Sequence, residues 1–363
     1  MNLVPATAEE LAAELAEANS KTRTISLCGN STKIGMGGPI APAETTISFS
    51  KLNRILQYEP RDLTISVEAG IAYRELTLAL AEHGQMIPLD PPFSGNSTIG
   101  GIIATNCSGP RRRLYGTARD MVIGMTFATL EGKLVKTGGM VVKNVAGLDM
   151  GKLMIGSFGT LAAIAIVNFK VHPIPPATRT FVQQFATGSE AIAARDAVLK
   201  SALQPAAIDI LKHSGYYELL IQAGGSTAML HRYSHELSAA RTIEGAEEQE
   251  RWNSIRELVP RFLAEHENGI VLRVSCALSE VGPVLEALPA PAVARAGSGV
   301  CYGCYQRFED IRYLGVIDFA PPAVRQNFEL WPQPGADFAM MKKVKEMFDP
   351  QGLLNRGRLY GRI

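Results

Sequence analysis

The sequence predicts an α+β fold of two or three domains, and three observations lead to that class. The chain has 363 residues, and a domain takes about 150 residues on average. Short strands joined by glycine-containing turns dominate residues 88–171, whereas the residues after Thr178 mix helices and strands with few glycine or proline breaks. Pro173, Pro175 and Pro176 separate the two regions as a stiff linker, which is the candidate domain boundary.

Composition excludes several classes of protein. Hydrophobic residues make up 46% of the chain and charged residues 20%, which is typical of a packed globular protein rather than a disordered or fibrous one. A net charge of +1 provides no field that would attract nucleic acid or an anionic membrane, so no nucleic-acid partner is expected. Five cysteines are an odd number in a long chain, and the N-terminus lacks a basic signal region; both favour the reducing cytoplasm.

Hydrophobic periodicity predicts the elements of the region before Gly84. The capping box Thr7-Ala8-Glu9-Glu10 begins a helix, because the threonine hydroxyl and the glutamate carboxylate can satisfy free N–H groups. Gly84 is a plausible C-terminal cap for the helix before it. The expected elements are helices at 8–18 and 72–83 and strands at 24–28, 45–50 and 63–67.

The same reading continues to the C-terminus. The uncharged stretch from Leu153 to Phe169 is shorter than the ~20 residues of a membrane-spanning helix, and Gly156 and Gly159 interrupt it. It is interpreted as a helix end, a turn and a buried strand, so no transmembrane segment is expected. The other expected elements are strands at 99–105, 121–130, 164–171 and 270–274, a polar helical run at 227–261 and a helix at 338–348.

Two glycine-rich clusters could approach a ligand closely. Gly29-Asn30-Ser31-Thr32-Lys33 follows a strand and offers consecutive backbone N–H groups with small side chains, the ingredients of an anion-binding nest; an ordinary turn is the alternative. In the run from Thr98 to Gly109, the paired Gly100 and Gly101 would let a flat ligand or another backbone come near; a glycine-rich β corner is the alternative.

In their order along the chain, the motifs resemble the FAD-binding domain of the p-cresol methylhydroxylase and vanillyl-alcohol oxidase superfamily. Within it, the chain is most similar to the FAD-binding subunits of bacterial glycolate oxidase. The matched pieces are Gly29–Lys33, Val67–Gly70, Asp90–Pro92, Thr98–Gly101, Ala104–Asn106, Gly109–Arg113, Gly116, Arg119–Asp120, Val142–Gly147, Gly156–Ser157, Gly159–Leu161, Asn355 and Gly357–Leu359.

The resemblance implies a domain arrangement around FAD. Residues 1–176 would form a two-subdomain FAD-binding domain, residues 177–320 a small α/β cap domain, and residues 321–363 a segment that returns to the FAD domain. The residues implied to contact the cofactor are Gly29, Asn30, Ser31, Thr32, Lys33, Asp90, Pro91, Thr98, Ile99, Gly100, Gly101, Ala104, Thr105, Asn106, Gly109, Gly116, Arg119, Asp120, Gly159, Thr160, Asn355 and Arg358.

The resemblance also implies roles within that set. The 29–33 loop and the 98–106 run would bind the pyrophosphate through backbone N–H groups, and Gly159 and Thr160 would lie near the adenosine and ribityl portion or the flavin edge. Asn355 and Arg358 would return to the flavin, where a guanidinium could stabilise the reduced ring. For Arg358, a surface cation near the chain end is the alternative.

The chain departs from the family pattern at several points. Cys28 and Asn30 stand where the loop commonly has more glycine, Leu148 replaces a tyrosine, and Ala162 replaces a glycine. No histidine lies in the pyrophosphate loop, so FAD is expected to bind noncovalently. Relatives that oxidise 2-hydroxy acids carry an H-x-G-D-G-N-x-H stretch in the cap, and this chain lacks it. The catalytic residues are therefore unknown, and no metal site is expected.

Four other features have ordinary explanations beside functional ones. His231 and His235 have metal-ligand spacing, but a solvated helix face is the favoured interpretation. Cys301 and Cys304 form a lone C-x-x-C, which favours an incidental thiol pair over an iron–sulfur cluster. Cys107 is interpreted as a small buried residue. The run Arg111–Arg113 is equally compatible with a local anion or partner contact and with a solvated loop.

The function implied is that of an FAD-binding subunit of a glycolate oxidase complex, which oxidises glycolate or a similar 2-hydroxy acid to the 2-oxo acid. Its expected partners are a catalytic flavoprotein subunit and an iron–sulfur subunit, with membrane association only through the complex. Two alternatives remain: an assembly subunit whose flavin is absent or redox-silent, and a free-standing FAD-dependent hydroxy-acid oxidoreductase.

Overall fold

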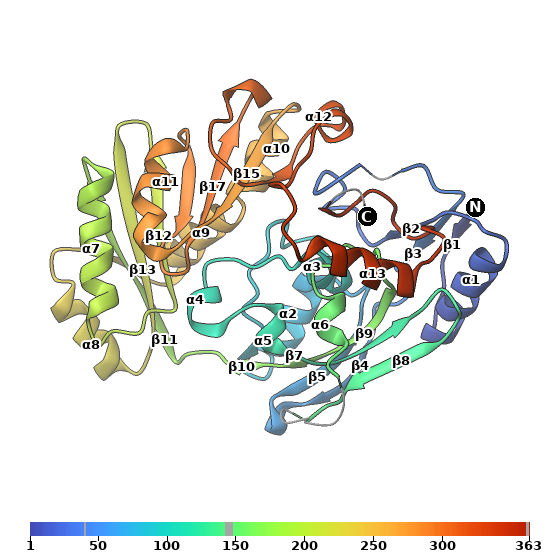
Figure 1. Cartoon of the computed structure of the whole chain (residues 1–363). Helices are drawn as coiled ribbons and strands as arrows, with labels where there is room; N and C mark the ends of the chain where they lie inside the picture. The colour runs from blue at the N-terminus through green and yellow to red at the C-terminus, as the bar shows by residue number, and fades with distance from the viewer. Residues whose placement is uncertain (40, 142–147, 361–362) are drawn as a thin grey trace.

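The computed structural model describes residues 1–39, 41–141, 148–360 and 363, and its elements form the two lobes seen in Figure 1. The motif Val142–Gly147 lies outside the described residues. Mixed helix and sheet structure confirms the predicted α+β class. No helix in the described ranges combines the length and the apolar character needed to cross a membrane.

The first lobe begins with a small parallel sheet of order β1-β3-β2. Helix α1 (Ala8–Ser20) buries Leu11 and Leu15 completely and contacts the larger sheet of this lobe. Only half of the predicted capping box forms, because the Glu10 carboxylate accepts from the N–H of Ala6 rather than of Thr7. The strands are β1 (Asn2–Leu3), β2 (Ile25–Cys28) and β3 (Thr45–Ser48).

The larger sheet of the first lobe is antiparallel, with the order β4-β5-β9-β7-β8. Helix α2 (Tyr73–Ala81) precedes Gly84, whose φ of +64° agrees with the predicted terminal glycine. The strands are β4 (Ile55–Glu59), β5 (Thr64–Glu68), β7 (Val122–Ala128), β8 (Leu134–Gly138) and β9 (Ala163–Lys170), and a separate pair joins β6 (Gln85–Met86) to β10 (His172–Pro173).

The predicted strand at 99–105 is wrong, because these residues form helix α3 (Ile99–Thr105). The Thr98 hydroxyl caps it by accepting from the N–H of Gly101 at 3.2 Å. Ile99, Ile102 and Ile103 are fully buried, which is a helical rather than an alternating pattern. A Cβ at Gly100 would lie 2.9 Å from the Cβ of Ala69, so this glycine lets the helix approach the strand end closely. Three further one-turn helices of the lobe are α4 (Arg112–Tyr115), α5 (Ala118–Met121) and α6 (Gly151–Met154).

The second lobe is built on an eight-stranded antiparallel sheet of order β14-β11-β13-β12-β16-β17-β15-β18. Helices α7 (Gly188–Lys200), α8 (Thr227–Glu236) and α11 (Val281–Ala287) belong to the core on one face, and α9 (Gly245–Arg256) packs on the other. The strands are β11 (Ala177–Phe185), β12 (Ala207–His213), β13 (Tyr216–Gly225), β14 (Arg241–Ile243), β15 (Ile270–Ser275), β16 (Ala292–Arg295), β17 (Val300–Tyr305) and β18 (Val316–Phe319).

The helical run predicted over 227–261 is interrupted. Strand β14 divides it, because Arg241–Ile243 pair with β11 and bury Ile243. Gly245, with a φ of +58°, then begins α9, and α10 (Leu258–Glu265) follows. Val259 and Phe262 of α10 pack into the core of the first lobe, so this segment joins the two lobes.

The C-terminal segment returns to the first lobe, as Figure 1 shows for α13. Helices α12 (Pro322–Asn327) and α13 (Phe338–Phe348) lead to Leu354, which forms a parallel bridge to Ile25 at the edge of β2. The helix at 338–348 has the predicted bounds. The eight-stranded sheet spans residues 177–319, and the cap domain was predicted over residues 177–320. The domain boundaries themselves stay a prediction.

Candidate functional site

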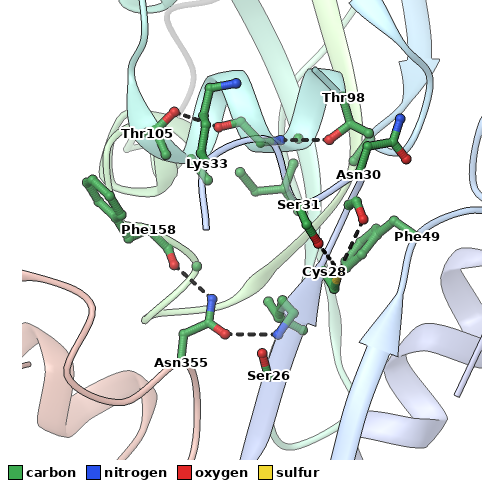
Figure 2. Close-up of a pocket in the computed structure, with 18 of the residues that line it drawn as sticks. Ser26, Cys28, Asn30, Ser31, Lys33, Phe49, Thr98, Thr105, Phe158 and Asn355 are labelled. Carbon is green, nitrogen blue, oxygen red and sulfur yellow. Dashed lines mark hydrogen bonds between the residues drawn. The ribbon is translucent and has the colours of Figure 1, made fainter. Parts of the chain in front are cut away.

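A first cavity of about 360 Å³ lies where β2, the 29–33 loop, α3 and the C-terminal segment meet (Figure 2). Cys28 occupies the end of β2, and its thiol lies 3.0 Å from the Ser31 hydroxyl. Thr98, Gly101 and Thr105 line the opposite wall from α3 and its cap. Three regions distant in the sequence, namely β2 with the 29–33 loop, α3 with its cap, and the C-terminal segment, therefore contribute to one pocket.

The 29–33 loop has the properties of an anion-binding nest. In the part of the chain that the structure describes, none of the five consecutive N–H groups from Gly29 to Lys33 donates to a protein acceptor. Ser31 has a φ of +56°, which turns the backbone at the centre of the loop. A run of free N–H groups that lines a cavity is a typical binding site for phosphate oxygens.

The 98–106 run was expected to donate backbone N–H groups to a ligand, but the first N–H groups of α3 already donate to acceptors within the protein. The N–H of Ile99 donates to the carbonyl of Ile71, and that of Gly100 donates to the carbonyl of Ala69 at 2.6 Å. The N–H of Gly101 points to the Thr98 hydroxyl. In this geometry α3 forms a wall, and the free donors belong to the 29–33 loop.

Two buried cations border the first cavity. Lys33 and Arg358 each expose only 6% of their surface, and neither forms a salt bridge with a described carboxylate. Burial lowers the pKa of Lys33, and it lowers the pKa of Arg358 to about 10, with the nearby charge of Arg325 adding to the effect. An anion in the cavity would compensate both cations. This burial removes the alternative that Arg358 is a surface cation.

The C-terminal segment closes the first cavity through Asn355. Its side-chain carbonyl accepts from the N–H of Leu27 at 2.8 Å, and its amide donates to the carbonyl of Phe158 at 2.8 Å (Figure 2). Gly159 has a φ of +69°, and a Cβ there would lie 2.7 Å from the Asn355 Nδ2 atom. The tail and the 158–159 turn therefore fit only with glycine at this position.

A second cavity of about 330 Å³ shares the walls Thr105 and Phe158 with the first. It lies between the lobes, because Asn106 and Arg112 line it from one side and strands of the eight-stranded sheet from the other. Its polar lining from the second lobe consists of Arg256, Arg273, Ser275, Arg295, Tyr302 and Asp318.

The arginines of the second cavity differ in their partners. Arg273 donates to both Asp318 oxygens, at 3.0 and 2.9 Å, and the charge of Asp318 raises its pKa. Arg295 pairs with the buried Asp209. Arg112 is bonded to the Ser108 hydroxyl at 3.2 Å and forms no salt bridge with a described carboxylate. Among the arginines that line this cavity, Arg112 is therefore the one whose guanidinium could bind an anion without breaking an ion pair to a described carboxylate.

The structure brings most of the sequence-predicted cofactor residues together. Those lining the first cavity are Gly29, Asn30, Ser31, Thr32, Lys33, Thr98, Gly100, Gly101, Ala104, Thr105, Gly159, Asn355 and Arg358. Asp90, Thr105 and Asn106 line the second cavity.

Seven predicted residues line neither cavity. Pro91 is buried, Ile99 is part of the core, and Gly109 packs against Asp90, where a Cβ would lie 2.1 Å from its carbonyl oxygen. Thr160 is buried and bonded to Ser157. Of the remaining three, Gly116 ends α4, and Arg119 and Asp120 are exposed on α5, where Asp120 completes a capping box with Thr117.

The arginine run 111–113 contacts both lobes. It is therefore more than a solvated loop, and its contacts lie within the chain rather than with an external anion or partner alone. Arg111 donates to both oxygens of the buried Asp90, at 2.6 and 2.8 Å. Burial alone raises the pKa of Asp90, but the charge and hydrogen bonds of Arg111 outweigh it and hold that pKa below its usual value. Arg113 packs its chain against Gly297 of the second lobe.

Sequence reasoning missed the residues of the second cavity. Arg256, Arg273, Arg295 and Tyr302 come from three strands and a helix, and no spacing along the chain unites them. It also missed Ser26 and Thr46 of the first cavity, which are register partners on β2 and β3. Strand alternation with Cys28 could have identified Ser26.

The other motifs behave as ordinary structure. His231 and His235 are exposed on α8, and Cys301 and Cys304 are buried free thiols of β17. Cys107 is buried, which raises the pKa of its thiol. Among the described residues, no group of three His, Cys, Asp or Glu side chains is placed to hold a metal ion.

The donor set of the first cavity suits FAD. Free N–H groups and two buried cations match a pyrophosphate, and Leu27, Phe49, Phe158 and Ile164 add apolar walls for ring systems. The positions at Gly29 and Gly159 leave no room for side chains, which keeps the backbone close to the cavity.

Comparisons with known proteins agree with this chemistry. Residues 2–138 match the FAD binding domain family, and residues 332–359 match the C-terminal domain of FAD linked oxidases. The chain is 27% identical to glycolate oxidase subunit GlcE of Escherichia coli (strain K12), and the match covers 98% of each chain. It is 31% identical to glycolate oxidase subunit GlcD of Bacillus subtilis (strain 168), over 48% of this chain and 37% of that one.

Solved structures support the fold. An alkyldihydroxyacetonephosphate synthase superposes with a TM-score of 0.73 at 20% identity, covering 98% of this chain and 75% of that chain. The family matches, the relatives and the donor set of the first cavity converge on one cofactor, FAD. Residues 2–138 therefore form an FAD binding domain, residues 332–359 match the C-terminal domain of FAD linked oxidases, and the chain is an FAD-dependent oxidoreductase.

Proposed function

We propose that this chain is the FAD-binding subunit of a glycolate-oxidase complex, which oxidises glycolate or a similar 2-hydroxy acid to the 2-oxo acid. Electrons would pass to an iron–sulfur subunit, and a sister flavoprotein would be the main catalytic subunit. The observation that carries the proposal is the contact between a cavity suited to FAD and an arginine-lined cavity, which meet at Thr105 and Phe158. Similarity to a glycolate oxidase subunit over 98% of both chains supports the choice of complex.

The residues of the first cavity would hold the cofactor. The 29–33 N–H groups and Lys33 would bind the pyrophosphate, and Arg358 would offset negative charge on the reduced flavin. FAD supplies an acceptor for the two electrons that the hydroxy acid loses.

The residues of the second cavity would hold the acid. Arg112 can donate two parallel hydrogen bonds to a carboxylate, a geometry that favours guanidinium over ammonium. Burial raises the pKa of Tyr302, so its hydroxyl keeps its proton at neutral pH and can donate to a substrate oxygen.

The lining of the second cavity favours a complex over a free-standing enzyme. Its carboxylates, Asp90 and Asp318, are each held by an arginine, and no histidine lines it within the described chain. A free base for the hydroxyl proton of the substrate is thus not provided by these side chains. The assembly-subunit alternative differs in predicting no reducible flavin.

The test combines the purified complex and the isolated chain. We expect stoichiometric flavin in the isolated chain, and reduction of that flavin by glycolate at least ~100-fold faster in the complex. We also expect oxalate, a two-carbon dicarboxylate, to perturb the flavin spectrum of the isolated chain. Arg112→Leu would weaken oxalate binding about 10-fold or more, because a charge-assisted hydrogen-bond pair contributes roughly 1.5–3 kcal/mol.

The matched control is Arg74→Leu, which removes an exposed arginine of α2 and is expected to leave oxalate binding unchanged. Absence of flavin, or flavin that the complex does not reduce, would favour the assembly subunit. Rapid reduction by glycolate without any partner would favour the free-standing oxidoreductase. Equal oxalate binding by Arg112→Leu and the unaltered chain would remove the second cavity from the proposal.

A further inference from the structure

We propose that Glu257, at the junction of α9 and α10 in the second lobe, is a positioning residue for the FAD-binding loop. It acts through the 92–97 loop, which lies between Glu257 and the 29–33 nest. The proposal rests on the assignment of the first cavity to FAD. It adds a residue of the cap that no contact with the cavity would reveal, because Glu257 does not line it.

Glu257 holds one end of the 92–97 loop. One carboxylate oxygen accepts from the N–H of Phe93 at 3.0 Å, and the other accepts from the N–H and the hydroxyl of Ser94 at 3.0 and 2.7 Å. Phe93 is not a glycine, yet its φ is +58°, a conformation that is unfavourable for a bulky residue. The bonds from Glu257 compensate that strain. The Phe93 ring also packs against Phe319 of β18, 5.7 Å between centroids.

The other end of the same loop holds the nest. The Ser97 hydroxyl accepts from the Lys33 ammonium at 2.6 Å and lies 3.2 Å from the Thr32 hydroxyl. The carbonyl of Asn96 accepts from the Asn30 side-chain amide at 2.9 Å. Three residues of the nest are therefore bonded to two adjacent residues of the loop.

The loop is short enough to transmit the position of one end to the other. The N–H groups of Asn96 and Ser97 both donate to the carbonyl of Phe93, at 3.1 and 2.9 Å, so the residues held by Glu257 and those that hold Lys33 share one turn. Tyr73 N–H donates to the Ser97 carbonyl at 2.8 Å and anchors that end. A change at Glu257 has to alter the turn that fixes Ser97.

The position of the Lys33 ammonium depends on this turn. Its ammonium is buried, and its bonds to Ser97 and, more weakly, to Thr32 fix its direction. Glu257 also contributes a negative charge near Lys33. Losing Glu257 would loosen the turn and leave the buried cation less well placed for a phosphate oxygen.

The test is a double-mutant cycle on the full chain, with the dissociation constant for FAD measured on apoprotein by flavin fluorescence. We expect Lys33→Met to weaken FAD binding by about 30-fold and Glu257→Ala by about 10-fold. The double variant is expected to bind within about twofold of Lys33→Met alone, because both changes act on one group. Glu257→Gln, which keeps one carbonyl acceptor, is expected to fall between Glu257→Ala and the unaltered chain.

A purely structural Glu257 would give additive losses, so additivity would overturn the proposal. Glu250→Ala, at an exposed position of α9, is the matched control and is expected to leave FAD binding unchanged. Ser97→Ala removes the loop hydroxyl without touching Glu257, and the same non-additivity with Lys33→Met is expected, even if Glu257→Ala does not fold. Unchanged FAD binding in Lys33→Met would overturn the cavity assignment itself, whereas an effect there and none at Glu257 or Ser97 would overturn only this inference.

Discussion

Gly29 shows how closely single residues control the first cavity. A Cβ placed there would lie 2.5 Å from the Oγ1 atom of Thr98, closer than nonbonded atoms can pack. The loop and the cap of α3 are therefore in contact, and their spacing sets the width of the cavity between them. Sequence reasoning identified this glycine, but only the structure shows that its role is to admit Thr98.

Gly29→Ala is predicted to release FAD. The loop or Thr98 would have to move, and overpacking costs about 1–3 kcal/mol, which corresponds to roughly 5- to 150-fold in affinity. Flavin content and the FAD dissociation constant measure the effect. Gly139→Ala is the control, since its Cβ would meet nothing within 4 Å. Equal affinity in the two variants would contradict the close contact at Thr98.

At the scale of elements, the C-terminal segment is fastened by a buried ion pair. Lys345 of α13 donates to Asp349 at 2.6 Å and to the carbonyl of Thr160 at 2.8 Å. Asp349 in turn accepts from the N–H groups of Leu353 and Leu354 at 2.9 and 2.8 Å. This carboxylate turns the chain from α13 toward β2 and so places Asn355 and Arg358.

Asp349→Ala is predicted to detach that segment. Breaking a buried pair leaves an uncompensated charge and costs about 3–5 kcal/mol of the free energy of unfolding, which urea denaturation measures. FAD affinity is expected to fall with it, because Asn355 and Arg358 lose their placement. Lys343→Ala, at an exposed position of α13, should change stability by less than about 0.5 kcal/mol. A stable Asp349→Ala variant with full FAD affinity would refute this account.

Elements with a strong period were predictable, and elements that depend on tertiary contacts were not. The helix at 338–348 and the strand at 25–28 follow from local patterns. The segment 99–105 was predicted wrongly as a strand; the burial of Ile99, Ile102 and Ile103 and the cap from Thr98 are those of a helix. Strand β14 could not be predicted, because it forms only by pairing with β11, a strand that is distant in the sequence.

At the scale of the whole molecule, a buried charge cluster joins the lobes. Asp90 of the first lobe is bonded to Arg111, and Arg256 of the second lobe lies 3.9 Å from the same carboxylate. Motifs within one segment revealed the FAD loop. The arginines of the second cavity escaped detection because the fold alone brings them together, and their sequence positions carry no pattern.

This cluster predicts a pH-dependent stability. The pKa of Asp90 is lowered in the folded chain, so its stabilising contribution is complete above the unfolded pKa of about 3.9 and is lost as the pH falls through the folded value. Asp90→Asn is expected to cost about 3–5 kcal/mol at pH 7 by leaving Arg111 unpaired. The difference in the free energy of unfolding between Asp90→Asn and the unaltered chain should become smaller below pH 4.

Urea unfolding between pH 3 and pH 7 measures the prediction. Asp62→Asn, at an exposed position, is the control and should lower stability at no pH by more than about 0.5 kcal/mol. A constant difference between Asp90→Asn and the unaltered chain over this range would mean that the carboxylate does not drive the acid sensitivity.

The bond between Leu27 and Asn355 spans 328 positions of the chain, and this bears on biosynthesis. A ribosome adds roughly 5–20 residues per second, so β2 waits on the order of 20–60 s before its partner has been synthesised. During that time the nest exists without its closing wall. The closed form of the first cavity is therefore completed only late in the synthesis of the chain.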